Sequence, residues 1–296
     1  MTGGTAVNSN ILADRYADIK ERLLALADED QSIRAVIAIG SSAREDSPAD
    51  EFSDLDLFII TADPEGWLEG DKPRQLGKIC ISFTEPTLGG GRERRCIYEG
   101  QRDVDMIILT PEQFGAALRE GIAGWVMNRG FRFLLDREGY AALAEKYITP
   151  GVSRQPMSEG DFLNTVNDFC FHNIWAYKKL LRGELWSAKM CIDAYLKRLL
   201  LAMAEEYHAL SGKDVWHDGR FLDRWAEPEV LDALTRCFAH YDPEDCKRAL
   251  AETHRLFAKL SEAVAAKRGF AYPGEALEYA AGSIGMQDDN KKGLSL

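Results

Sequence analysis

The sequence predicts an α+β protein, in which a mixed sheet with helices in the first half is followed by a helical bundle. Short runs rich in Ile, Val, Leu and Phe, bounded by Gly, Pro, Asp and Ser, recur over residues 33–135, as strands and turns do. Beyond residue 160, apolar side chains recur at helical spacing instead. No segment there alternates with the period of two that strands show.

The first half is predicted to begin with a helix over residues 11–26, where apolar side chains recur every three or four positions. Five strands are expected after it, at residues 33–39, 55–60, 79–83, 95–98 and 104–109. Two more helices are expected at residues 112–120 and 138–147.

The second half is predicted to contain helices at residues 161–182, 184–208, 228–239 and 243–268, with a short one after Pro273. Residues 149–160 hold two prolines and two glycines and are the expected linker. We therefore expect a first domain at 1–150 and a helical domain at 151–296. Residues 288–296 are expected to be a frayed tail.

The chain has 296 residues, with 36 Lys and Arg against 48 Asp and Glu, so its formal charge is −12. The first 150 residues hold 26 acidic and 17 basic side chains. An acidic balance argues against a nucleic-acid partner and is compatible with a cationic small molecule. The six cysteines show no CxxC spacing and no cluster with histidine, so reduced thiols are expected rather than a zinc site.

The sequence also predicts that the protein does not associate with a membrane. No apolar run approaches the roughly 18 residues of a membrane helix, and the first residues lack the layout of a signal peptide. We expect a cytoplasmic monomer or homodimer.

The sharpest local signal begins where the first predicted strand ends, at Gly40 and Ser41. The next strand opens with Asp54-Leu55-Asp56. Because strand side chains alternate faces, both carboxylates project together while Leu55 faces the core. Two unpaired carboxylates repel unless a cation lies between them, and Mg²⁺ prefers such ligands and shares them with substrate phosphates. Gly40 lets the backbone approach a phosphate closely, and the Ser41 hydroxyl can hydrogen-bond to it.

A third carboxylate, Asp105, lies on the strand predicted at 104–109. If that strand neighbours the strand of Asp54 and Asp56, the three side chains can hold two metal ions roughly 3.5–4 Å apart. Each of these motifs also has an interpretation without a functional role, since Asp-x-Asp often opens a solvated strand and Gly-Ser often lies in a loop. Their order along the chain is nevertheless typical of the polymerase-beta type of nucleotidyltransferase fold.

Longer stretches resemble one family with that fold, the bacterial aminoglycoside 6-adenylyltransferases, or streptomycin adenylyltransferases. The resemblance runs from about residue 11 to residue 280. It is carried by Gly40-Ser41, residues 52–56, the strand with Asp105, residues 167–169, residues 178–185, Asp193 with residues 196–200, and residues 269–273. The family often continues Gly-Ser with Arg-Thr-Asn-Pro, whereas this chain continues with Ser42-Ala43-Arg44-Glu45.

The resemblance implies Mg²⁺-dependent transfer of AMP from the co-substrate ATP to an aminoglycoside hydroxyl, with release of pyrophosphate. Asp54, Asp56 and Asp105 are then the catalytic residues and the metal ligands. Asp105 is also the candidate general base, because a carboxylate beside the metal can take the hydroxyl proton. Glu99, at the end of the preceding predicted hairpin, is the second candidate for the base, and a solvated hairpin residue is an equally good interpretation of it.

The resemblance also implies that residues 1–150 form the nucleotidyltransferase domain and residues 151–296 the substrate-binding domain, so further contacts to the substrates are expected from both halves of the chain. The candidates for the ATP phosphates are Gly40, Ser41, Arg44 and Lys178. An ion pair with a nearby acid is the alternative for Arg44, and a solvated helix face is the alternative for Lys178. The candidates for a cationic acceptor are Glu99, Glu184, Asp193 and Glu205.

Other features have structural interpretations. The basic run Arg92, Arg94 and Arg95 beside three glycines is expected to be a solvated loop, with phosphate contact as the alternative. The aromatic side chains at 169, 171, 175, 177 and 186 are expected in the bundle core.

Two other functions compete with aminoglycoside adenylylation. One is nucleotidyl transfer to a different hydroxyl, on a lincosamide or a protein side chain. The other is a non-catalytic nucleotide-binding module, against which the three carboxylates argue.

Overall fold

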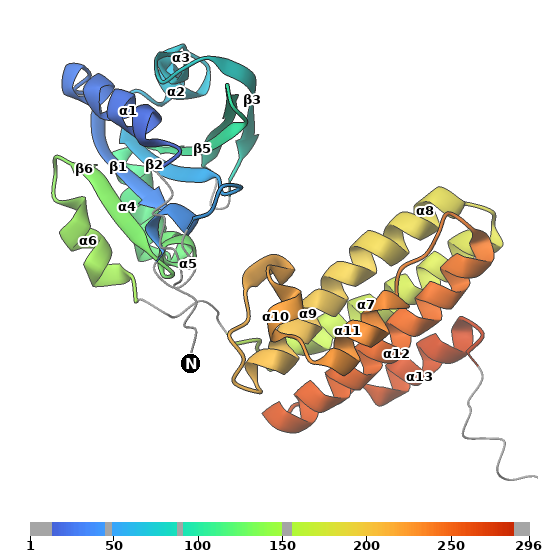
Figure 1. The fold of residues 1–296 in the computed structure, drawn as a ribbon. Coiled ribbons are helices and arrows are strands. Elements are labelled where there is room, and N and C mark those ends of the chain that lie inside the picture. Colours follow the sequence, from blue (N-terminus) through green and yellow to red (C-terminus); the bar gives the residue numbers. More distant parts are fainter. Residues whose placement is uncertain (1–13, 45–48, 88–90, 150–155, 287–296) are drawn as a thin grey trace, which may run out of the picture. The chain divides into compact units, whose positions relative to one another are not determined.

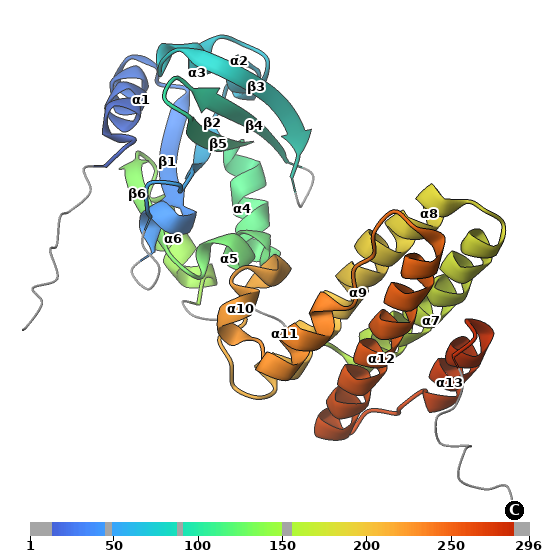
Figure 2. The same cartoon turned by 45° about the vertical axis from the view of Figure 1, so that its right-hand side comes forward.

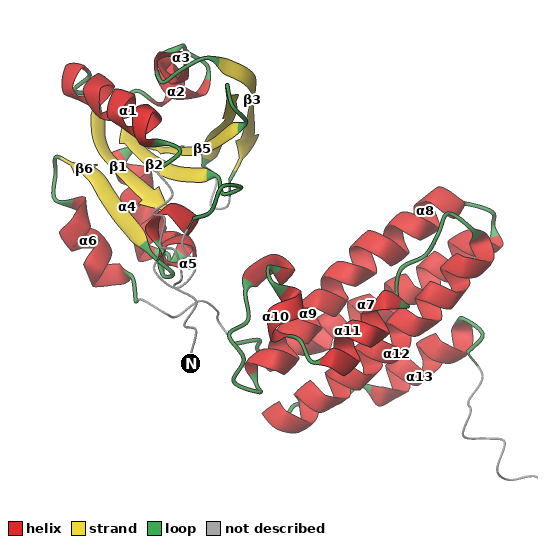
Figure 3. Ribbon diagram, viewed as in Figure 1, coloured by secondary structure: helices red, strands yellow, loops and turns green. Residues whose placement is uncertain are grey.

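Within the part of the chain that the structure describes, the strands lie in the first half and the second half is helical (Figure 3). The computed structural model describes residues 14–44, 49–87, 91–149 and 156–286. The chain divides into two compact units between Arg154 and Gln155, and each is described here by itself (Figure 1). The predicted α+β class is confirmed.

A six-stranded mixed sheet forms the centre of the first unit, in the order β3-β4-β5-β2-β1-β6. The strands are β1 (Ile33–Ile39), β2 (Leu55–Thr61), β3 (Ile79–Pro86), β4 (Arg92–Tyr98), β5 (Arg102–Leu109) and β6 (Phe131–Asp136). Only β2 and β5 run parallel among these neighbours, and the other pairs are antiparallel.

Helices cover both faces of this sheet (Figures 1 and 2). One face packs on α1 (Ala17–Glu29), α2 (Pro64–Leu68) and the residues around α3 (Lys72–Gln75). The other face packs on α4 (Pro111–Arg119), α5 (Ile122–Met127) and α6 (Tyr140–Tyr147). Because both faces are covered at its centre, β1 and β2 are almost continuously buried, which explains why their sequences are apolar runs rather than alternating patterns.

Several elements of the first unit differ from the predictions. The sequence analysis did not predict strand β6 or the helices α2, α3 and α5. These helices have only four to six residues, which is too short to show a 3.6-residue period. Strand β4 begins at Arg92, so the predicted solvated loop for its three arginines is wrong. Arg94 and Arg95 contact Ser82 and Glu85 of the neighbouring strand β3, and Arg92 pairs with Glu69. The local sequence does not reveal these contacts.

The second unit is a helical bundle around one apolar core. Its helices are α7 (Glu159–Leu181), α8 (Leu185–Met190), α9 (Leu196–Ala209), α10 (Leu222–Trp225), α11 (Pro228–Thr235), α12 (Pro243–Arg268) and α13 (Gly274–Ser283). The predicted bounds of α12 are correct, because Asp242 caps its first backbone N–H groups and Gly269 ends it in the left-handed conformation.

Other parts of the second half depart from the predictions. The helix predicted at 184–208 contains a π-helical turn at Cys191–Tyr195, between α8 and α9. Helix α7 already begins at Glu159, so the last residues of the predicted linker are helical, and residues 150–155 lie outside the described part. The predicted tail at 288–296 lies outside it as well. Phe171 and Trp186, expected in the core, are 64% and 68% exposed.

Two predicted absences can be compared with the described residues. No described helix combines the length and the apolar character needed to cross a membrane. The six cysteines are all free thiols.

His254 on α12 makes the stability of the second unit sensitive to acid. It is 3% exposed, and burial lowers its pKa to about 4. The unfolded chain, with an ordinary histidine pKa near 6.5, therefore binds more protons between these values. We expect wild type to lose about 3 kcal/mol of unfolding free energy from this residue as the pH falls from about 6.5 to 4.

Urea unfolding of His254→Gln at several pH values tests this expectation. The variant should lose most of the acid-dependent slope that wild type shows in this window. His240→Gln is the comparison variant: its imidazole side chain is 96% exposed and pairs with Asp245 at 2.9 Å, so this variant should keep the part of the slope that burial of His254 causes. An unchanged slope in His254→Gln would contradict the assignment.

Candidate active site

Three carboxylates meet where the parallel strands β2 and β5 begin. Asp56 and Asp105 are direct partners in the register of these strands, and Asp54 lies just before β2. One oxygen from each of the three lies within 4.8 Å of the other two, and all three side chains are partly buried. The structure thus brings together the three residues that the sequence analysis selected from two distant segments.

The charges of this cluster favour a bound cation. Burial raises the pKa of Asp105, the Arg95 guanidinium opposes this, and the Asp54 carboxylate raises it again. Like charges held this close repel each other, and a divalent cation between them removes that cost. Carboxylate oxygens are the hard donors that Mg²⁺ prefers, so the donor set of Asp54, Asp56 and Asp105 fits that metal.

The turn after β1 lies directly against this cluster. Gly40 begins a short 3₁₀ turn (Gly40–Ala43) with φ of +64°, and a Cβ atom there would lie 2.2 Å from Asp56 Oδ2. Within the turn, the Ser42 hydroxyl donates to the Ile39 carbonyl at 3.0 Å. The buried Ser41 hydroxyl oxygen has no hydrogen-bond partner among the described residues, which leaves it available to an added acceptor or donor.

Gly40→Ala should therefore damage the site more than the fold. The left-handed backbone costs about 1–2 kcal/mol for a residue with a Cβ atom, and the new methyl group must displace the Asp56 carboxylate. A displacement of about 1 Å in a reacting group can cost about 10²-fold in rate. We expect turnover to fall by about that factor, measured as kcat with saturating substrates.

Gly139→Ala provides the matched control for Gly40→Ala. Gly139 has a similar φ of +77°, but nothing lies within 4 Å of an added Cβ atom. Both variants should melt at similarly reduced temperatures, while only Gly40→Ala loses turnover. Equal turnover in the two variants would show that Gly40 is needed for its backbone conformation alone.

Two residues before α1 fix the segments that lead into the carboxylate strands. The Tyr16 hydroxyl donates to the Ser53 carbonyl at 2.8 Å, next to Asp54. The Arg15 guanidinium donates to the Gly100 and Gln101 carbonyls, both at 2.6 Å, and to Glu51 O. Sequence reasoning treated Tyr16 only as an apolar helix position and did not select Arg15.

The hairpin of β3 and β4 adds a charged group beside Asp105. Arg95, the strand partner of Asp105, places its Nε atom 3.4 Å from Asp105 Oδ2, 2.7 Å from Glu93 Oε1 and 2.8 Å from Glu85 Oε1. Burial raises the pKa of Glu93, Arg95 opposes this, and a hydrogen bond with Glu85 raises it further. Sequence reasoning missed this group, because a hairpin register is needed to bring its members together.

The other predicted site residues lie elsewhere. Glu99 follows β4 and pairs with Lys78 at 2.9 Å, so it does not join the carboxylate cluster. Arg44 is partly buried directly after the Gly40–Ala43 turn.

Four candidates belong to the second unit, and one of them, Glu205, accepts a hydrogen bond from the Gly219 N–H at 3.3 Å. Lys178 is exposed on α7. Glu184 pairs with Lys179 and Arg182, and Asp193 pairs with Lys189.

Comparisons with known proteins agree over most of the chain. A family model described as streptomycin adenylyltransferase matches residues 13–281. An aminoglycoside 6-adenylyltransferase of Bacillus subtilis (strain 168) is 23% identical over 274 residues, which cover 86% of this chain and 92% of that protein.

Two solved structures are also similar. The crystal structure of an aminoglycoside 6-adenyltransferase from Bacillus subtilis has a TM-score of 0.43 at 18% identity, covering 92% of this chain and 99% of that chain. A nucleotidyltransferase-like protein from Exiguobacterium sibiricum 255-15 has a TM-score of 0.40 at 12% identity, covering 84% of this chain and 78% of that chain.

Proposed function

Because this chain belongs to the streptomycin adenylyltransferase family and is a nucleotidyltransferase, we propose that it transfers AMP from ATP to a hydroxyl of an aminoglycoside such as streptomycin. The observation that carries the proposal is the cluster of Asp54, Asp56 and Asp105, whose oxygens lie within 4.8 Å of one another. The first unit is proposed to be the nucleotidyltransferase domain, and the second unit to contribute to acceptor binding.

Asp54, Asp56 and Asp105 are the proposed Mg²⁺ ligands. Mg²⁺ bound there would offset the negative charge on the attacking and departing oxygens. The three side chains supply anionic oxygens and, being partly buried, are less screened by water than surface carboxylates. Gly40 leaves room for this arrangement, because a side chain at its position would collide with Asp56.

The triphosphate of ATP is proposed to lie over Gly40 and Ser41. The Ser41 hydroxyl has no hydrogen-bond partner among the described residues, which supports this placement, because a phosphate oxygen would accept its hydrogen bond. Arg44, directly after the turn, and Lys178 of the second unit are the proposed cationic contacts of the triphosphate.

The reaction is an in-line substitution at the α-phosphorus of ATP. The acceptor hydroxyl oxygen forms the new P–O bond while the bond to the β-phosphate bridging oxygen breaks, so that AMP is transferred and pyrophosphate leaves. The Asp105 carboxylate takes the hydroxyl proton. It is partly buried beside the proposed metal site, where the acceptor hydroxyl would meet the α-phosphorus.

The acidic character of the chain supports a cationic acceptor. The formal charge is −12, and a field of that sign attracts polycations such as aminoglycosides. Glu99, Glu184 and Asp193 remain proposed acceptor contacts. Each of them now pairs with a lysine, so an ammonium group of the acceptor would replace that lysine.

The experiment that tests this function is incubation of the protein with ATP, Mg²⁺ and streptomycin, followed by mass detection of an AMP adduct and measurement of released pyrophosphate. We expect both products in equal amounts. A lincosamide and GTP are run in parallel as alternative acceptor and donor. ATP binding without pyrophosphate release for any acceptor would instead favour a non-catalytic nucleotide-binding module.

A further inference from the structure

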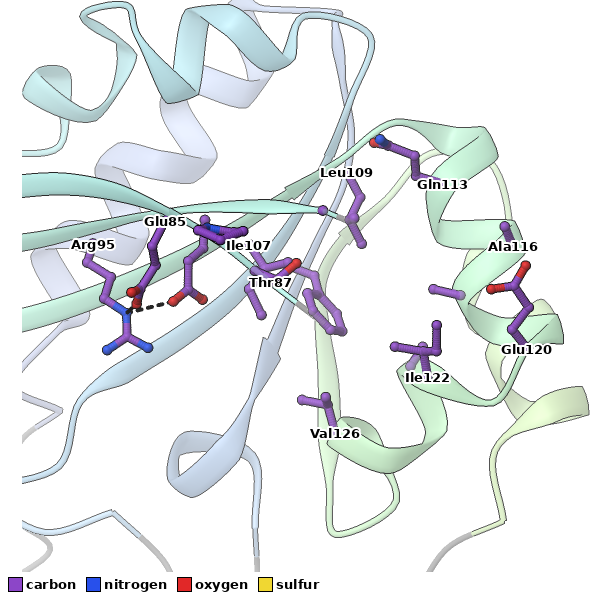
Figure 4. Close-up of a pocket in the computed structure, with 16 residues that line it drawn as sticks. Glu85, Thr87, Arg95, Ile107, Leu109, Gln113, Ala116, Glu120, Ile122 and Val126 are labelled. Carbon is purple, nitrogen blue, oxygen red and sulfur yellow. Dashed lines mark hydrogen bonds and ion pairs between the residues drawn. The ribbon is translucent and has the colours of Figure 1, made fainter. Parts of the chain in front are cut away.

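A cavity of about 540 Å³ lies in the first unit, between the sheet and the helices α4 and α5 (Figure 4). Its walls are apolar over most of their extent and include Phe58, Ile107, Leu109, Ala116, Ile122 and Val126. Glu85, Glu93 and Arg95 line it as well. A volume of this size with mostly apolar walls and a few polar groups is typical of sites for small molecules.

The charged end of the cavity adjoins the carboxylate cluster. Glu85 and Glu93 face each other across the β3–β4 hairpin, and Arg95 Nε lies within 2.8 Å of an oxygen of each. The same Nε atom lies 3.4 Å from Asp105 Oδ2. The Arg95 guanidinium therefore contacts both the carboxylates that line the cavity and Asp105, the proposed catalytic carboxylate.

The charges at this end do not balance. Three carboxylates, of Glu85, Glu93 and Asp105, surround one guanidinium, that of Arg95. The Arg95 side chain is 44% exposed, whereas that of Glu93 is 10% exposed. Arg95 is thus the more exposed partner, whereas the carboxylate of Glu93 is largely buried and, when ionised, is stabilised by a cationic partner.

We propose that this cavity receives the acceptor, with a guanidinium or ammonium group held by Glu85 and Glu93 and a ring of the acceptor against the apolar walls. The inference rests on the proposed function. The observed pairing of Arg95 with both carboxylates demonstrates that their spacing accommodates a guanidinium. The phosphates of ATP are disfavoured here, because these carboxylates repel anions.

This placement also gives the cavity a part in the reaction. The Arg95 Nε atom lies 2.7 Å from Glu93 Oε1 and 3.4 Å from Asp105 Oδ2. A cation of the acceptor that takes this place on Glu93 would therefore bring a hydroxyl on the same ring toward the group that takes its proton. Glu85 and Glu93 then determine specificity by positioning the acceptor, and they do not exchange protons with it.

Titration calorimetry with streptomycin, in the presence of Mg²⁺ and α,β-methylene-ATP, tests the inference, because this analogue cannot release pyrophosphate. Glu93→Gln and Glu85→Gln should each raise the streptomycin Kd by about tenfold or more, the usual effect of losing a hydrogen bond between charged groups. The Kd of the ATP analogue should stay within about twofold. Glu21→Gln is the control, since Glu21 is exposed on α1, which covers the other face of the sheet.

A second pair of variants tests the apolar part without changing charge. Ala116→Phe should fill the cavity and weaken streptomycin binding, while Ala142→Phe, on the exposed side of α6, should not. Thermal melting by circular dichroism establishes that each variant is folded.

The outcomes separate this inference from the proposed function. If wild type forms the AMP adduct of streptomycin but Glu93→Gln and Ala116→Phe bind streptomycin as wild type does, the acceptor lies elsewhere and only this inference is overturned. If Ala116→Phe raises the Kd of the ATP analogue but not that of streptomycin, the cavity belongs to the nucleotide. That result would overturn this inference as well. If wild type neither binds nor modifies any aminoglycoside, the proposed function itself fails.

Discussion

Replacing Asp54 or Asp56 with Asn should lower turnover by about 10³-fold or more and leave the fold intact. Each substitution removes one of three anionic oxygens that lie within 4.8 Å of one another. Charge stabilisation by a metal held in such a site is worth several kcal/mol in the transition state, and about 4 kcal/mol corresponds to a factor of about 10³ in rate. The measurement is kcat for pyrophosphate release with saturating ATP and streptomycin.

The same substitutions should not destabilise the metal-free protein. Removing one charge from a crowded carboxylate cluster relieves repulsion, so the melting temperature in EDTA should hold or rise slightly. Mg²⁺ with ATP should raise the melting temperature of wild type, because a ligand that binds only the folded state stabilises it, and should raise that of the variants less.

Asp28→Asn, an exposed position on α1, is the control for the change in charge. It should match wild type in both turnover and melting temperature. A large fall in melting temperature with turnover retained in Asp54→Asn would assign the cluster a structural role instead of metal binding.

Asp105→Asn should lower kcat by about 10²–10⁴, the usual contribution of a positioned base. The amide keeps the size of the side chain and one oxygen, but it cannot take a proton at neutral pH. If Asp105 acts chiefly as the base, the affinity for ATP with Mg²⁺ should change little while kcat falls.

Titrating the metal separates the two roles of Asp105. If it is chiefly a ligand, nucleotide affinity should fall together with kcat, and excess Mg²⁺ or Mn²⁺ should restore part of the rate. Wild-type rates in Asp105→Asn would contradict both roles. The search for the base would then move to Glu99 or to a carboxylate of the second unit.

The elements of the carboxylate site could be predicted because their signals are local. The apolar runs of β1 and β2 identify buried strands, and Asp54 and Asp56 are adjacent on one strand face. The position of Asp105 beside them could be expected only on the condition that β2 and β5 are neighbours. The structure supplies that condition through the direct pairing of Asp56 with Asp105.

The surroundings of the site could not be predicted, because they depend on contacts between distant segments. Arg95 reads as part of a basic run until the register of β4 with β5 places it opposite Asp105. Arg15 contacts Gly100 and Gln101, although it is 85 and 86 residues away in sequence. No spacing rule within one segment indicates such contacts.

The β3–β4 hairpin forms one edge of the sheet and is joined to the remaining strands through β5 alone. It carries Glu85 and Glu93, whereas Asp54 and Asp56 lie at the start of β2, deeper in the sheet. If Glu85 and Glu93 hold the acceptor as proposed, a change on the hairpin that keeps Arg95 opposite Asp105 would alter which cation is received without moving Asp54 or Asp56. In evolutionary terms, this architecture allows acceptor range and nucleotidyl transfer to diverge separately, and in engineering terms it makes the hairpin the segment to diversify in a library.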